Sequence, residues 1–89
     1  MVFKLVVPFE KRFINLLGEI IYTDKICEKI KISGRNRSII IQSNRPIFLS
    51  GGLKHRKLDW KLIEGEMYST HLFQVICQEV EKFLKTNIQ

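Results

Sequence analysis

Apolar side chains occupy every second position near the start of this chain. Residues 3–7, FKLVV, alternate in this way, and a period of two predicts a half-buried strand. Pro8 follows at once. Because proline has no N–H to give to a sheet ladder, it ends such a strand or places it at a sheet edge.

Residues 9–22 change to a different spacing. Phe13, Leu17 and Ile21 fall four positions apart, which predicts an amphipathic helix. Gly18 lies inside this stretch and costs a helix about 1 kcal/mol relative to alanine. The alternative is a second strand with a bulge at the glycine.

Residues 28–43 predict a β-hairpin. Apolar isoleucines at 30 and 32 alternate with lysines, SGRN at 33–36 supplies turn chemistry, and three β-branched isoleucines follow at 39–41. Pro46 then breaks the pattern, and residues 47–49 could resume the strand. A further alternating stretch at 57–63 predicts another strand, which Gly65 ends.

The C-terminal stretch, residues 69–85, predicts an amphipathic helix. Ser69 suits the N-cap position, and Tyr68 and Phe73 stand at the positions of a hydrophobic staple. Glu81 and Lys85 form a favourable i,i+4 pair. The apolar stripe comprises Leu72, Phe73, Ile76, Val80, Phe83 and Leu84.

Together these elements predict a single α+β domain over residues 1–89. The expected order is β-α-β-β-β-α, with a mostly antiparallel sheet of three to four strands and the helices packed on one face. The face toward the helices would carry Leu5, Ile30, Ile32, Ile39, Ile41, Leu58, Trp60 and Leu62. The opposite face would carry Lys29, Lys31, Ile40, Gln42, Lys57, Lys61 and Ile63.

Composition supports a folded domain with a small core. The chain has 89 residues, of which 45% are hydrophobic and 27% charged. Cys27 and Cys77 are fifty positions apart among apolar residues, which indicates buried free thiols and a reducing, cytoplasmic setting. The apolar stretch at the N-terminus is too short for a signal peptide or a membrane span.

Positive charge gathers in the middle of the chain. The net charge is +6, but residues 25–61 alone carry +8 and the remaining residues −2. A clustered basic region is what polyanion binding requires, because each neutralised phosphate releases counterions. The alternative is that lysines and arginines only keep an exposed sheet face solvated.

The candidate contacts for a polyanion lie in two turns, in the break at 43–46 and on one strand. The stretch SGGLKHRK at 50–57 lacks the phosphate-loop pattern and precedes a strand, so a basic hairpin loop is expected there. It either contacts phosphates or blunts a sheet edge with charge. The candidates are Arg35, Arg37, Arg45, Lys54, His55, Arg56, Lys57 and Lys61.

No pattern of nucleophile, base or metal ligands is recognisable. His55 and His71 are the two histidines, and no serine or cysteine has a catalytic signature around it. Two cysteines and two histidines without local pairing do not predict a zinc site. Trp60 alternates with Leu58 and Leu62, which places it in the core and not on a base-stacking surface.

The sequence therefore predicts a small non-catalytic domain, without cofactor or metal, that binds a polyanion. Nucleic-acid backbone, contacted without strong reading of sequence, is the expected partner. The alternative is a protein-interaction or self-association module, and a small core favours a homodimer. A third hypothesis is an enzyme that acts on an anionic substrate.

Overall fold

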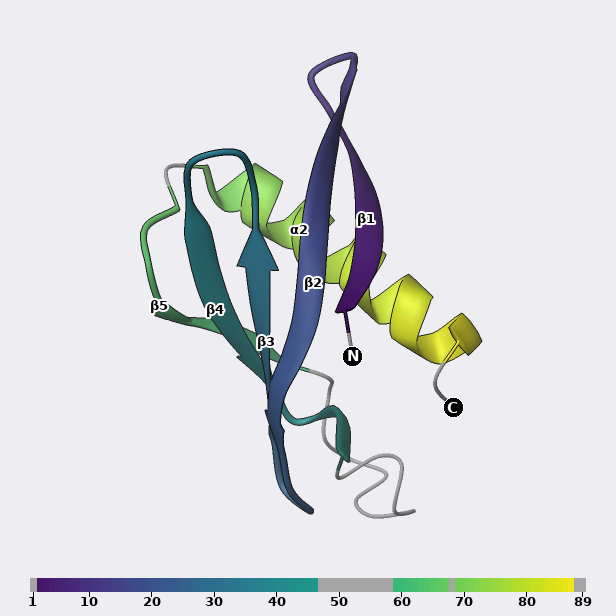
Figure 1. Ribbon diagram of the computed structural model, residues 1–89, viewed down its shortest axis with the longest axis vertical. Coiled ribbons are helices and arrows are strands. Elements are labelled where there is room, and N and C mark those ends of the chain that lie inside the picture. The colour runs from purple at the N-terminus through teal and green to yellow at the C-terminus, as the bar shows by residue number, and fades with distance from the viewer. Residues whose placement is uncertain (1, 47–58, 68, 88–89) are drawn as a thin grey trace.

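The computed structural model describes residues 2–46, 59–67 and 69–87. In these residues the chain forms a five-stranded antiparallel sheet in the order β1-β2-β3-β4-β5, crossed on one face by the C-terminal helix α2 (Figure 1). The elements are β1 Val2–Phe9, β2 Arg12–Thr23, β3 Glu28–Ser33, β4 Ser38–Ser43, β5 Trp60–Glu64 and α2 Thr70–Asn87.

The helix predicted over residues 9–22 is wrong. Phe9 ends β1, Glu10 and Lys11 form a two-residue turn, and the rest of the stretch is β2, paired with β1 in an unbroken register. Both turn residues have positive φ, 50° and 64°, as the hairpin turns that match strand twist require. The sheet therefore has one strand more, and the described chain one helix fewer, than the sequence predicts.

Gly18 has a different role in the strand from either prediction. The register shift in β2 lies between Ile20 and Tyr22, not at the glycine. A Cβ atom on Gly18 would stand 2.5 Å from the ring of Phe3. That ring in turn stacks on Phe83 of α2, with centroids 4.3 Å apart. The glycine therefore makes room for an aromatic stack that joins the first hairpin to the helix.

The hairpin predicted over residues 28–43 is confirmed. β3 and β4 pair from Glu28↔Ser43 to Ser33↔Ser38, and the amide of Gly34 closes the turn by donating to the carbonyl of Arg37 at 2.8 Å. Their inner face, toward α2, is apolar as predicted, with buried side chains at Ile30, Ile32, Ile39 and Ile41.

The C-terminal helix is also confirmed, and it begins where the sequence predicts. The hydroxyl of Ser69 accepts a hydrogen bond from the amide of Leu72 at 3.1 Å, which is N-cap geometry. Ile76, Val80 and Leu84 are buried, and the other members of the apolar stripe pack partly buried around them. Tyr68 and the side chain of Lys85, on which the staple and the i,i+4 pair depend, lie outside the described residues.

The last strand, β5, is shorter than the predicted stretch. Trp60 packs partly buried against the core, and Leu62, although paired with buried Ile41, is 36% exposed at the sheet edge. Gly65 ends the strand with a φ of +93°, as a glycine can. Leu58 and Lys57 fall outside the described residues.

The two thiols have different surroundings. Both cysteines are free, but Cys77 is buried whereas Cys27 is partly exposed. Burial, and to a lesser extent the nearby Glu81 carboxylate, raises the pKa of the Cys77 thiol to about 12. Cys77 is therefore a neutral core residue at physiological pH.

Among the described helices, none has the length and apolar character needed to cross a membrane.

Candidate nucleic-acid interface

The outer face of the sheet, the face turned away from α2, brings polar and aromatic side chains into one cross-strand row. Tyr22 of β2 pairs with Lys29 of β3, Lys29 pairs with Gln42 of β4, and Gln42 pairs with Lys61 of β5. Directly paired residues point to the same face, and neighbouring strands are about 4.8 Å apart. We call Tyr22, Lys29, Gln42 and Lys61 the basic row.

Lys31 adds a further positive charge beside this row. It lies two positions along β3 from Lys29, on the same face, and is exposed. Its partner across β2 is Glu19, and Glu64 of β5 pairs with the neighbouring Ile40. Lys29, Lys31 and Lys61 therefore outnumber the two glutamates on this face, while Asp24 and Asp59 lie beside the basic row. Of the four lysines that the sequence places together, Lys29, Lys31 and Lys61 share this face, and Lys57 lies outside the described residues.

Tyr22 is the functional candidate that the sequence did not reveal. Its side chain is 47% exposed, and the ammonium group of Lys29 lies 5.2 Å from the centre of its ring. Because residues 9–22 are predicted as a helix, the sequence does not assign Tyr22 to the sheet. The predicted outer face therefore contains no aromatic residue from that stretch. The register shift after Ile20 is the feature that brings Tyr22 opposite Lys29.

A short loop holds the Tyr22 hydroxyl in place. This hydroxyl donates a hydrogen bond to Asp24 Oδ2 at 2.6 Å, and Asp24 Oδ1 accepts the amides of Ile26 and Cys27 at 2.7 and 2.8 Å. The Tyr22 bond, followed by the two amides, lowers the pKa of Asp24 to about 2. The same bond, more than the negative charge of Asp24, raises the pKa of Tyr22. The ring is therefore tethered at its hydroxyl end and stays neutral at physiological pH.

The predicted contacts occupy opposite ends of the sheet. Arg35 and Arg37 belong to the turn that joins β3 to β4, just before Ser38. Lys61 lies at the other end of β4, next to Gln42, and Asp59 approaches its ammonium group at 3.9 Å on the exposed surface. Such an exposed pair contributes little. Lys54, His55, Arg56 and Lys57, the basic loop of the sequence prediction, lie outside the described residues.

Arg45 has a structural role that the sequence did not indicate. Its Nε donates to Glu28 Oε1 at 2.5 Å and its terminal nitrogen to Oε2 at 2.8 Å, while the Ser43 hydroxyl donates to Oε1 at 3.0 Å. Glu28 is 1% exposed and the Arg45 side chain 12%. The bidentate pair therefore fastens the chain after β4 to the beginning of β3.

Metal and nucleophile chemistry have little to build on in the part of the chain that the structure describes. There, no three histidine, cysteine or acidic side chains gather closely enough to hold a metal ion. His71 stands in the first turn of α2 with its ring against Phe9, at a centroid distance of 5.7 Å. The outer face instead offers cations, an amide and an aromatic ring.

Comparison with protein-family models, with curated proteins and with solved structures gives no match for this chain.

Proposed function

We propose that the outer face of the sheet binds the backbone of a nucleic acid, without strong reading of its sequence. The observation that carries this proposal is the basic row, in which two lysines, an amide and an aromatic ring follow one another across four strands. Lys31 reinforces it from the same face. Lysines contact phosphates as point charges, and glutamine can donate to phosphate or sugar oxygens.

Tyr22 favours a single strand over a duplex. Its ring is half exposed beside the lysines, and an exposed aromatic ring can stack on an unpaired base, whatever the base. In a duplex the bases are already stacked on each other, so the ring would have less to contribute. The lysines would then hold the phosphates on either side of the stacked base.

Arg35 in the β3–β4 turn extends the proposed surface toward a polymer, whereas Arg37 of the same turn lines a cavity on the inner face of the sheet. Arg35 precedes β4, and Lys61 lies near its far end. At about 3.3 Å per residue, a six-residue strand separates these groups by roughly 17–20 Å. A chain of phosphates spans that distance, whereas a small anion does not. Lys54, His55, Arg56 and Lys57 lie outside the described residues, and we propose them as further contacts for the same nucleic acid.

A titration of fluorescent oligonucleotides at two salt concentrations tests the proposal. The triple variant Lys29→Gln, Lys31→Gln, Lys61→Gln removes three positive charges from the outer face. Log affinity should fall with log salt by about 0.7 per phosphate contact on a single strand, so the variant should flatten the slope by about two. Unchanged affinity and slope in this variant would overturn the proposal.

A matched control separates site from net charge. Lys11→Asn, Arg12→Gln, Lys82→Gln also removes three positive charges, but from the first hairpin turn and the helix. Asparagine is chosen at Lys11 because φ there is 64°, which asparagine tolerates. This control should bind nearly as the parent does. If both variants lose affinity equally, binding follows net charge and not the outer face.

Self-association is the second proposal, and sedimentation measures it directly. A small core favours a homodimer at micromolar concentration. Sedimentation that shows only a 10.5 kDa species would contradict this proposal. The open edge of β1 is a poor place for it. Because Phe9 and Arg12 close a two-residue turn, the backbone hydrogen-bonding groups of Lys4, Val6 and Pro8 point away from β2. There Lys4 brings charge and Pro8 lacks an N–H, both of which discourage strand addition.

The proposed role is non-catalytic and calls for no cofactor or metal. A reducing, cytoplasmic setting fits the two free thiols.

A further inference from the structure

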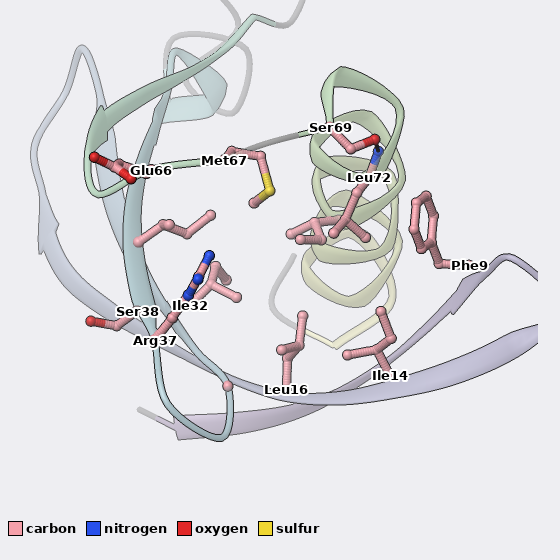
Figure 2. Close-up of a pocket in the computed structure, with 13 residues that line it drawn as sticks. Phe9, Ile14, Leu16, Ile32, Arg37, Ser38, Glu66, Met67, Ser69 and Leu72 are labelled. Atoms are coloured by element: carbon pink, nitrogen blue, oxygen red, sulfur yellow. Dashed lines mark hydrogen bonds between the residues drawn. The ribbon is translucent and has the colours of Figure 1, made fainter.

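A cavity of about 360 Å³ lies between the inner face of the sheet and the first turns of α2 (Figure 2). It is on the opposite side of the sheet from the basic row. Ile14 and Leu16 of β2 form its floor, and Leu72 and Ile76 of α2 form the facing wall. Met67, in the segment that leads into the helix, extends over it.

The wall of this cavity is apolar, and its polar neighbours are occupied or balanced. The hydroxyl of Ser69 already caps the helix by accepting the Leu72 amide. Among the described lining residues the charged ones are Arg37 and Glu66, which carry opposite charges. The described lining residues therefore carry no net charge. The chemistry of the cavity suits an uncharged apolar molecule.

The position of the cavity follows from the fold. The contact between Phe9 and His71 holds the end of β1 close to the first turn of α2. Ile32 and Ile39, exposed by only 3% and 6%, belong to the core and also reach the cavity wall. The space is thus continuous with the core of the domain. It is also open toward solvent, so its apolar wall stays in contact with water unless an apolar molecule covers it.

Its volume sets the size of that occupant. Small-molecule sites range from about 300 to 1,000 Å³ and are mostly apolar with few polar groups, and this cavity lies at the lower end of that range. A partner helix would need an elongated groove with several side-chain pockets. A thioether side chain such as Met67 adapts its shape easily, which suits a wall that closes over a ligand.

We propose that this cavity binds an uncharged apolar small molecule, of the size of a medium-length alkyl chain or a compound of two or three rings. The apolar body would contact Leu16, Leu72 and Ile76, and a lone hydroxyl or carbonyl group would lie at the rim, near Arg37 and Glu66. This site is independent of the basic row and of any nucleic acid bound there.

Fluorescence of the neutral probe N-phenyl-1-naphthylamine tests the proposal on the full chain. Binding should be saturable, and 1-octanol should displace the probe at least tenfold more effectively than octanoate, because the cavity offers no net charge. Absence of saturable binding, or equal displacement by the two competitors, would overturn it.

Filling the cavity provides the matched comparison. Leu16→Phe and Leu72→Phe each add a ring to the wall and should weaken probe binding at least tenfold. Val6→Phe adds the same bulk on the outer face, at a side chain that is 52% exposed, and should bind as the parent does. Circular dichroism checks that each variant is folded. Should both filled variants lose their fold, contacts in the parent between octanol protons and the methyl groups of Ile32 and Leu72, measured by NMR, decide: their absence contradicts the site.

Discussion

Two neighbouring hairpins of this sheet differ in how plainly the sequence encodes them. The β3–β4 hairpin alternates isoleucines with polar residues and turns at SGRN, so one face is apolar and one polar. The β1–β2 hairpin turns at Glu10 and Lys11, neither of which is typical of a turn, and β2 carries apolar residues on both faces. Strand pairing, however, is equally regular in both.

The comparison shows why a spacing of four residues misleads. Phe13, Leu17 and Ile21 fall on one face of a helix, but positions four apart also share a face of a strand. In the structure these three side chains lie exposed, at 74%, 46% and 45%. Without a turn signal at residues 10 and 11, nothing in the pattern separates the two periods. Turn chemistry, more than hydrophobic spacing, is therefore what made one hairpin predictable.

The largest expected effect concerns the buried ion pair of the β3–β4 hairpin. Arg45→Gln leaves the Glu28 carboxylate buried without its cation, so the free energy of unfolding in urea should fall by about 3–5 kcal/mol. The double variant Glu28→Gln, Arg45→Gln should lose less of its free energy of unfolding, because it leaves no unpaired charge buried. A loss below about 1 kcal/mol in the single variant, as for an exposed pair, would contradict this role.

A smaller loss is expected at Gly18 in the β1–β2 hairpin. Gly18→Ala places a methyl group where the ring of Phe3 lies, and overpacking of this kind costs about 1–3 kcal/mol in thermal or urea unfolding. Adding Phe3→Leu should make the double variant less unstable than the two single losses predict, since the clash is relieved. Strict additivity would show that the ring and the glycine do not interact.

The turn of the same hairpin should respond in the opposite direction. Glu10→Asn with Lys11→Gly replaces two residues held at positive φ by the pair that such turns prefer. The left-handed region costs other residues roughly 1–2 kcal/mol each, so this variant should unfold at higher urea concentration, by about 1 kcal/mol. The same two substitutions would also make the hairpin recognisable from sequence. A destabilised variant would mean that the turn is held by its side chains.

The smallest effect is the acid titration of the loop between β2 and β3. The pKa of Asp24 is lowered to about 2, so the Tyr22 and amide hydrogen bonds stabilise the loop fully above the ordinary pKa near 4. This contribution is lost as the pH falls through about 2. The amide shifts of Ile26 and Cys27 should therefore titrate with a midpoint near pH 2. A midpoint near 4 would show that these bonds do not form.

Much of the fold could be predicted from the sequence, whereas the candidate surfaces could be predicted only in part. The helix, its cap and the β3–β4 hairpin follow from local patterns, and Lys29, Lys31 and Lys61 follow from strand alternation. Tyr22 could not be predicted, because its face depends on a register shift within β2.

Longer-range contacts explain the remaining differences. The role of Arg45 depends on a partner 17 residues earlier in the chain, which no local pattern reveals. The cavity depends on how α2 lies over the beginning of β2, so it too is a property of packing rather than of sequence pattern.

The most direct test of the proposed nucleic-acid surface is a map of amide shift changes by NMR, as a single-stranded oligonucleotide is added at low salt. We expect the largest changes at Tyr22, Lys29, Lys31 and Lys61, and little change along the exposed side of α2. Changes confined to α2 or to the cavity, or no changes at all under these conditions, would contradict the proposal that the outer face of the sheet binds nucleic acid.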